Sequence, residues 1–409
     1  MQASYHELRS SKGIRIGLAS IPESECAAVS IHIPAGSRDD PPGLSGLAHF
    51  VEHMVFKGTE TRDARQISFE TEDVGASLNA CTSEDSTVYE ARGDASTLPL
   101  LVDILTSIVW RPSFPADEIA LECDVIAEEI VMYQESPSDH IGDLISKALW
   151  FPHPLGESIS GSLESIKRID RSALQEFARR HHFREDVVVS VAGPFDEEQV
   201  LKLFEVHLPA TTSSSASTLY RASDDPRRSE IEARDTQQLQ LAIAYACFGR
   251  RDSRRHALRL LGMILGEGAS SRLFQELREE RGLCYQVGCE VTLFEDTGAL
   301  EIHAGLDPAS REEALACIHR HLESLSKHGP NEAELARAKR LCASASRAAM
   351  ESTATHAEWI GECLLQHERV ITPQEAIQVI EAVTSNEVQQ VAAILFTPAN
   401  EALAEIRPA

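Results

Sequence analysis

The sequence predicts an α+β fold of two homologous halves, each a mostly antiparallel sheet packed with helices. The length of 409 residues suits two or three domains of roughly 150 residues each. A Ser/Thr-rich segment near the middle, Leu208 to Glu230, has the composition of a linker. The order of strand-like and helix-like segments before it recurs after it, which indicates a tandem duplication. We therefore expect an N-terminal domain over residues 1–207, a linker over 208–232 and a C-terminal domain over 233–409.

The first half begins with strand-like segments and continues with helices. Two alternating runs are followed by the Pro-Pro-Gly break and a helix, and two further strands flank a Ser-Glu-Asp turn. A β-branched run near the end has the composition of a buried strand. The predicted strands are 13–20, 27–36, the pair within 76–93, and 186–193, and the predicted helices are 44–56, 96–110, 116–134, 139–150, 163–181 and 196–206.

The second half repeats this order. An alternating run predicts a strand, and two amphipathic stretches predict helices. A hairpin, long helical stretches and a closing strand follow. The predicted ranges are a strand at 238–248, helices at 254–266 and 270–282, a hairpin of 283–294 with 298–306, and a last strand at 401–406.

The charge of the chain excludes two classes of partner. The formal net charge is −26, whereas binding to nucleic acid or to an anionic membrane needs basic surface. Residues 1–205 carry 17 basic and 35 acidic side chains, a net charge of −18. This excess is explained either by a solvated acidic surface or by an acidic cavity that favours basic ligands.

The cysteines and the hydropathy pattern predict a soluble, cytoplasmic protein. The nine cysteines are scattered, form no CxxC pair, and are odd in number, which favours reduced thiols over a disulfide framework. The first twenty residues lack the apolar run of a signal peptide, and the chain has no 18-residue apolar stretch.

The segment "LAHFVEHMVFKGT" places His49, Glu52 and His53 on one predicted helix. Because the histidines are one turn apart, both rings can reach one point in front of the helix. Zinc prefers such nitrogen ligands, and Glu52 beside them could take a proton from a bound water. Two surface histidines beside a solvated glutamate are the alternative that the motif alone leaves open.

A third ligand is expected from the helix that contains "LECDVIAEEIVMYQE". Glu122 and Glu129 are seven residues apart and share one helical face. Glu129 would complete a His-His-Glu set, and Glu122 would support a ligand histidine. A solvated acidic helix is the alternative, since residues 101–150 hold ten acidic and two basic side chains.

At this point the chain resembles a known family of zinc peptidases. HxxEH is the inverted zinc motif of the inverzincins, and its surroundings are similar to those of the pitrilysin family, which includes insulin-degrading enzyme and the mitochondrial processing peptidase. The resemblance covers nearly the whole chain, in the stretches "GLSGLAHFVEHMVFKGT", "GASLNACTSEDSTVYEA", "ECDVIAEEI", "HPLGESISGSLESI", "VVVSVAG" and "SSRLFQELREERGLCYQV".

The resemblance implies one Zn²⁺ per subunit, bound by His49, His53 and Glu129, with Glu52 as general base. Glu122 corresponds to the family's supporting glutamate. Arg278 and Tyr285 correspond to a distant pair that contacts substrate and stabilises the tetrahedral intermediate. The family's edge strand, which pairs with an extended peptide, corresponds to Gly75, Ala76, Ser77, Leu78, Asn79 and Ala80.

The resemblance therefore predicts a zinc-dependent endopeptidase of the short, two-domain type. It implies a homodimer that encloses a closed chamber and cleaves peptides or unfolded segments, with basic peptides favoured by the acidic first half. Two alternatives remain: a non-catalytic subunit that serves as scaffold or partner of a processing peptidase, and a different zinc hydrolase or lyase that uses the same motif.

Overall fold

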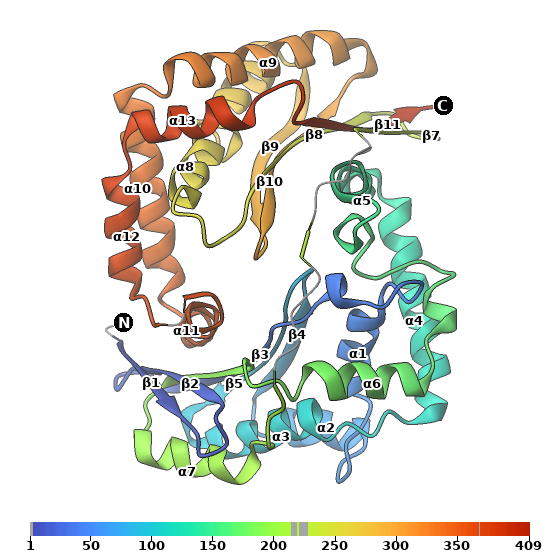
Figure 1. Cartoon of the computed structure of the whole chain (residues 1–409), viewed down its shortest axis with the longest axis vertical. Helices are drawn as coiled ribbons and strands as arrows, with labels where there is room; N and C mark the ends of the chain where they lie inside the picture. The colour runs from blue at the N-terminus through green and yellow to red at the C-terminus, as the bar shows by residue number, and fades with distance from the viewer. Residues whose placement is uncertain (1–2, 214–218, 221–227, 368) are drawn as a thin grey trace. The chain divides into compact units, whose positions relative to one another are not determined.

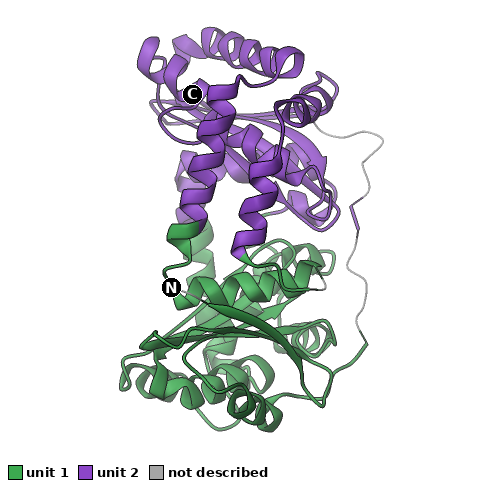
Figure 2. Cartoon of the chain, turned by 90° about the vertical axis from the view of Figure 1, so that its left-hand side faces the viewer, with its two compact units in different colours: residues 1–130, 158–218, 347–372 green, residues 131–157, 219–346, 373–409 purple. Residues whose placement is uncertain are grey.

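The structure is a computed structural model that describes residues 3–213, 219–220, 228–367 and 369–409 (Figure 1). The chain forms two compact units, coloured separately in Figure 2. Unit 1 comprises residues 1–130, 158–218 and 347–372, and unit 2 comprises residues 131–157, 219–346 and 373–409. Each unit therefore consists mostly of one half of the chain and takes one segment from the other half.

Unit 1 is built on a six-stranded sheet with the order β1-β2-β6-β3-β5-β4. All neighbouring strands are antiparallel except β2 and β6, which are parallel. The strands are β1 (Ser4–Arg9), β2 (Arg15–Ser20), β3 (Cys26–Ile33), β4 (Ser77–Thr82), β5 (Thr87–Asp94) and β6 (Val188–Gly193).

Helices cover both faces of this sheet (Figure 1). One face packs on a large aliphatic core shared with the helices of the first half, and the other face packs on α11 (Thr353–His367). The helices of the first face and its surroundings are α1 (Leu47–Val55), α2 (Ala64–Glu72), α3 (Leu98–Trp110), α4 (Ala116–Glu135), α6 (Arg171–His181) and α7 (Glu197–His207).

Unit 2 is built on a five-stranded sheet with the order β7-β11-β8-β10-β9. One face packs on α8 and its neighbours, and the other on α5 (Pro137–Trp150). The strands are β7 (Ser229–Arg234), β8 (Leu239–Phe248), β9 (Cys284–Leu293), β10 (Thr297–Leu306) and β11 (Glu401–Pro408), and the further helices are α8 (Arg255–Gly266), α9 (Arg311–His328), α10 (Glu332–Ala349), α12 (Pro373–Ala382) and α13 (Ser385–Leu395).

The two sheets share one pattern of strand pairing. In unit 1 the run β6-β3-β5-β4 is antiparallel and β2 lies parallel to β6; in unit 2 the run β11-β8-β10-β9 is antiparallel and β7 lies parallel to β11. Each sheet also packs on a helix from the other half of the chain, and we call α5 and α11 the exchanged helices. They occupy corresponding positions, because α11 packs on β2, β3 and β6, and α5 packs on β7, β8 and β11. This supports the predicted duplication, and the predicted α+β class with two mostly antiparallel sheets is confirmed.

Small side chains on the strands admit the exchanged helices. Along β8, Leu241 and Ile243 pack in the main core of unit 2, whereas Ala242 and Ala244 face α5. On the α11 face of unit 1, a Cβ on Gly17 of β2 would approach Ile360 to 2.9 Å. Since alternate strand residues point to opposite faces, the alternation of large and small residues builds a thick core on one side and a close helix contact on the other.

Two helix predictions need correction. The helix predicted over 163–181 is α6, which begins at Arg171, because the Asp170 side chain caps it by accepting the Ala173 N–H (2.8 Å). Ahead of it, Ile166–Arg168 forms only a single 3₁₀ turn. The helix predicted over 270–282 is π-helical over Phe274–Glu280, here called η5.

The sequence reasoning missed β1, α2 and β7. Most of the predicted linker, namely residues 214–218 and 221–227, lies outside the described residues, and β7 begins within its last part. The domain boundaries at 207 and 233 stay a prediction. Across the described residues, none of the helices combines the length and apolarity required for a membrane span.

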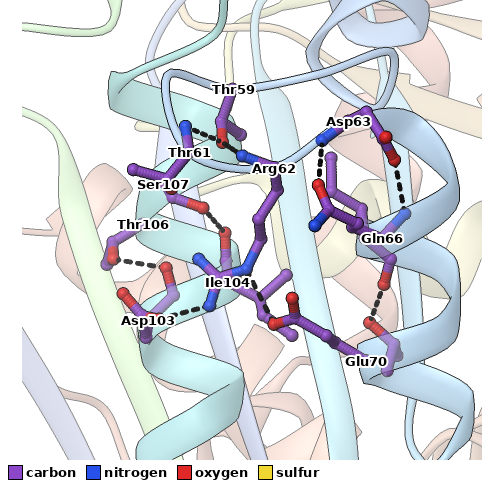
Figure 3. Close-up of polar contacts among 12 residues, drawn as sticks. Thr59, Thr61, Arg62, Asp63, Gln66, Glu70, Asp103, Ile104, Thr106 and Ser107 are labelled. Atoms are coloured by element: carbon purple, nitrogen blue, oxygen red, sulfur yellow. Dashed lines mark hydrogen bonds and ion pairs between the residues drawn. The ribbon is translucent and has the colours of Figure 1, made fainter.

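The loop after α1 is fixed by Arg62 (Figure 3). Its guanidinium donates to Glu70 of α2 (2.8 Å) and to Asp103 of α3 (2.6 Å). The Thr59 hydroxyl accepts the backbone N–H groups of Thr61 and Arg62. These contacts join α2 and α3 to the end of the helix that carries the HxxEH motif.

Candidate metal centre

Helix α1 presents the HxxEH motif and starts at a buried carboxylate. Asp40 accepts the backbone N–H groups of Gly46 (2.7 Å), Leu47 (3.2 Å) and Ala48 (2.8 Å), which the first turn of a helix leaves unpaired. Gly46 has φ +90°, and a Cβ there would lie 2.5 Å from the Ser160 carbonyl oxygen. Hence α1 begins at Leu47 rather than at the predicted Leu44.

The two histidine rings of the motif face one point. The Nε2 atoms of His49 and His53 are 3.2 Å apart, and the rings meet edge to face. Burial, reinforced by His53, lowers the pKa of His49 to about 4. His49 is therefore neutral near pH 7 and has a nitrogen lone pair available for a cation.

Glu129 of α4 approaches both rings. Its Oε1 lies 3.8 Å from His49 Nε2, and its Oε2 lies 3.7 Å from His53 Nε2. These separations are too long for hydrogen bonds. All three side chains offer ligand atoms within 4.8 Å of one another.

Glu122 supports His53 from a position two turns before Glu129 on α4. It is buried, and its Oε1 lies 2.8 Å from His53 Nδ1, while Lys57 also binds its carboxylate. Burial raises the pKa of Glu122, but the hydrogen bonds from His53 and Lys57 outweigh it, and the net shift is downward. An ionised Glu122 accepts the Nδ1 proton of His53, so the unprotonated nitrogen of His53 is Nε2, on the side of His49 and Glu129.

The donor set fits zinc. Two imidazole nitrogens and a carboxylate oxygen are zinc ligands, and donors bound at 2.0–2.2 Å in tetrahedral array lie about 3.3–3.5 Å apart. The 3.2, 3.7 and 3.8 Å separations require only small side-chain movements to reach that array. His49 Nδ1 is buried without a hydrogen-bond partner among the described residues, so the ring is held by packing.

Glu52 lies one residue before His53 and is anchored by β4. Its Oε2 accepts the Thr82 hydroxyl. Burial raises the pKa of Glu52 and the Thr82 hydrogen bond lowers it; the effect of burial is larger, so the net shift is upward. A carboxylate whose pKa is moved toward neutral pH is suited to act as a general base.

The predicted substrate-binding stretch lies at the edge of the unit 1 sheet. Gly75 adopts a positive φ of 68° at the turn before β4, and Ala76 follows it. The strand β4, with Ser77 to Ala80 as its first residues, is last in the sheet order, so its outer side has no partner strand in the described ranges. Asn79 donates to Glu90 Oε1 of β5 at 3.2 Å.

Arg278 and Tyr285 lie in unit 2 and contact each other. The Arg278 guanidinium carbon is 5.1 Å from the Tyr285 ring centroid and 4.7 Å from that of Phe274. Tyr285 is 78% exposed. The structure therefore brings these two predicted residues together in an exposed stack on unit 2.

The sequence reasoning missed Asp40, Lys57 and Thr82. Asp40 lies six residues before Gly46, the N-cap of α1, so the usual N-cap signal does not reveal it. Lys57 is one turn after His53, on the side of Glu122. The contact of Thr82 with Glu52 depends on tertiary packing and leaves no local signal.

Two family models match adjoining parts of the chain. Residues 15–162 match "Insulinase (Peptidase family M16)", and residues 168–342 match "Peptidase M16 inactive domain". The first match contains the HxxEH segment and Glu129, and the second contains Arg278 and Tyr285.

Relatives and solved structures agree with this assignment. An uncharacterized zinc protease of Mycobacterium bovis is 33% identical over 94% of this chain and 89% of its own, and one of Bacillus subtilis is 30% identical over 97% and 96%. A Pseudomonas fluorescens structure described as a peptidase M16 inactive domain superposes with TM-score 0.91 at 21% identity, covering 99% of this chain and 98% of its own. A Helicobacter pylori protease gives 0.89 at 21% identity over the full length of both chains. The chain is therefore a short, two-domain member of peptidase family M16, as the sequence motifs predicted.

Proposed function

We propose that this protein is a zinc-dependent endopeptidase that cleaves peptides or unfolded segments. The carrying observation is the convergence of His49, His53 and Glu129, from two separate helices, on one point beside Glu52. The relatives named zinc proteases support the metal and the reaction class.

Each residue of the site has a distinct role in the proposed mechanism. His49, His53 and Glu129 would hold one Zn²⁺, which when bound lowers the pKa of a water ligand to about 7 and polarises a carbonyl. Glu122 keeps His53 Nε2 unprotonated through the Nδ1 hydrogen bond. Glu52 takes a proton at its carboxylate, with Oε2 held by Thr82, and returns it to the leaving amine.

Substrate would bind to the open edge of β4. Backbone hydrogen bonds hold an extended peptide without reading its side chains, which suits an enzyme that accepts many sequences. Arg278 and Tyr285, stacked on each other, supply a cation and a phenol donor for the developing oxyanion. A homodimer enclosing a closed chamber would restrict access to peptides, and sedimentation analysis of the purified chain tests the dimer.

A preference for basic peptides is part of the proposal. Glu90 and Glu358 lie near each other on unit 1. Burial raises the pKa of Glu358, and the negative charge of Glu90 raises it further. A cationic side chain beside them would relieve this repulsion. The test compares neutral with Lys/Arg-rich versions of one peptide at low and high salt; equal rates under both conditions would remove this part of the proposal.

The compartment proposed is the cytoplasm. No disulfide joins any of the nine cysteines, all of which lie in the described residues, and reduced thiols are typical of a cytosolic protein. Oxidative trapping of the thiols in intact cells would show their redox state.

The test of the reaction is a peptide-pool digest with matched variants. Wild type should cleave, a chelator should stop cleavage, and Glu52→Gln should lose at least about 10²-fold in kcat, as loss of a general base does. Glu52→Gln should keep bound zinc, because Glu52 is not a ligand. Zinc binding without cleavage of any peptide would favour the alternative of a non-catalytic subunit that serves as scaffold or partner.

A further inference from the structure

A second cluster of metal-binding side chains lies in unit 2. Cys317 and His321 are one turn apart on α9, and Glu276 faces them from η5. Their ligand atoms all lie within 4.8 Å of one another. Neither the HxxEH motif nor the Arg278–Tyr285 stack includes any of the three.

The contacts of Glu276 divide between its two oxygens. Oε1 accepts hydrogen bonds from Arg281 (2.9 Å) and Arg320. Oε2 lies 2.6 Å from His321 Nε2. The arginines therefore orient the carboxylate so that its other oxygen points at His321.

His321 Nε2 has Glu276 Oε2 as its near partner, but in poor hydrogen-bond geometry. The atom is buried, and the described residues offer it no hydrogen bond of acceptable geometry, although Oε2 is near. A buried polar atom in this condition calls for an explanation. A cation bound by both atoms would require them to move apart from 2.6 Å to about 3.3–3.5 Å, the separation of two donors in a tetrahedral zinc site.

We propose that Glu276, Cys317 and His321 bind a divalent transition-metal cation such as Zn²⁺. Thiolate, imidazole and carboxylate together form a ligand set that suits this class of ion, with a fourth position open to solvent. The negative charges of Glu276 and a Cys317 thiolate offset the charge of the ion. The binding itself does not depend on the proposed peptidase activity.

The protonated Cys317 thiol and two nearby arginine side chains oppose cation binding. Burial and the Glu276 carboxylate raise the pKa of the Cys317 thiol to about 11, so the incoming cation releases the thiol proton to solvent. The guanidiniums of Arg281 and Arg320 repel the cation, and Arg320 also donates to Cys317 Sγ (3.2 Å). Their side chains are 40% and 52% exposed, so both can turn toward solvent when the cation binds.

The site would restrain the segment that carries Arg278. Glu276 and Arg278 are two residues apart on η5, and π-helical turns frequently occur at functional sites. A cation shared with α9 would fix η5 and with it the Arg278–Tyr285 stack. This consequence, unlike the binding, rests on the proposed function.

Cobalt substitution separates this cluster from the HxxEH site, because only this cluster contains sulfur. Metal-free full-length protein is titrated with Co²⁺, and the thiolate-to-cobalt charge-transfer absorption is recorded. The band should appear in wild type and in His49→Ala, and disappear in Cys317→Ser. Cys342→Ser is the matched control on the neighbouring helix and should keep the band.

Further variants protect the test against misfolding. If circular dichroism shows that Cys317→Ser is unfolded, His321→Ala and Glu276→Gln replace it, and both should lose the band. Absence of the band in folded wild type, or its persistence in folded Cys317→Ser, would mean that the cluster is only an ion-pair network. Neither result depends on whether peptides are cleaved.

Discussion

At the scale of single residues, Glu122 links the ligand histidine to the rest of the molecule. Its carboxylate accepts a hydrogen bond from His53 Nδ1–H and forms an ion pair with the Lys57 ammonium. Replacing Glu122 with Gln should weaken zinc binding at the HxxEH site by about 10–100-fold, the usual effect of losing such a supporting carboxylate. Competition with a chromophoric chelator, in a Cys317→Ser background, measures this site alone.

Glu128→Gln is the matched control for this change. Glu128 is an exposed glutamate on the same helix, so its replacement should leave zinc affinity unchanged. Equal affinities for the Glu122 and Glu128 variants would show that Glu122 does not support His53.

Buried His32 predicts how stability depends on pH. Burial lowers the pKa of His32 to about 4 from its usual 6.5. The ring has Ser190 Oγ at 3.1 Å from Nε2 and faces Gly361 of α11. The folded state binds a proton on the His32 ring less tightly than the unfolded state does. The stability that depends on a neutral His32 is therefore fully present above pH 6.5. It is lost as the pH falls toward 4, by roughly 3 kcal/mol.

His32→Gln keeps a partner for Ser190 but cannot titrate. Its free energy of unfolding, measured by denaturant titration at several pH values, should fall less steeply between pH 6.5 and 4 than that of wild type. His328→Gln, at an exposed site, should follow wild type. A His32→Gln slope equal to that of wild type would contradict the assignment.

At the scale of elements, the start of α1 depends on Asp40. Asp40→Ala removes three hydrogen bonds to backbone N–H groups inside the protein and should cost more than about 2 kcal/mol of unfolding free energy. Asp170→Ala removes one exposed cap of α6 and should cost about 1 kcal/mol. Chemical denaturation measures the unfolding free energy of both variants. Equal losses would show that Asp40 does not stabilise the start of α1 more than an ordinary exposed cap does.

The exchanged helices provide a pair of glycine substitutions with opposite effects. A Cβ at Gly361 of α11 would lie 1.9 Å from His32 Nε2, whereas a Cβ at Gly142 of α5 would meet nothing within 4 Å. Gly361→Ala should therefore lower the melting temperature through overpacking. Gly142→Ala should raise stability by about 0.5–1 kcal/mol through helix propensity.

Differential scanning calorimetry measures both glycine variants. A Gly361→Ala protein as stable as wild type would mean that α11 does not pack closely on the sheet of unit 1.

Local sequence patterns were sufficient for most elements and for the proximity of His49, His53 and Glu129. The alternation in 238–248 predicted β8, and the four-residue spacing of His49 and His53 predicted a shared face. The exchange of α5 and α11 was not predicted, because helical periodicity shows that a helix has an apolar face and does not show which sheet covers it. The alternation of leucine with alanine in β8 was the available signal, since small residues on one face invite a close helix.

The missed contacts share one physical cause. Thr82 reaches Glu52 across 30 residues of sequence, and Asp103 reaches Arg62 across 41. Such pairs are fixed by tertiary packing, which a single sequence does not display. Asp40 accepts backbone N–H groups six to eight residues later, beyond the reach of the N-cap pattern, so it too was not recognisable from sequence.

At the scale of the whole molecule, the two units share a strand pattern but carry different clusters of polar side chains. Each unit has the same strand pairing and receives one helix from the other half of the chain. Unit 1 holds the HxxEH cluster and the open β4 edge, and unit 2 holds the Arg278–Tyr285 stack and the Glu276 cluster. In the proposed mechanism, the metal and base come from one copy and the oxyanion donors from the other.

The central claim is that side chains from α1 and α4 hold one metal ion. Anomalous X-ray scattering at the zinc edge, from crystals of protein grown with zinc, tests it most directly. We predict a peak bounded by His49 Nε2, His53 Nε2 and Glu129, and loss of that peak in His53→Ala. A zinc-loaded crystal with no density at this point, or with zinc only at other sites, would contradict the account.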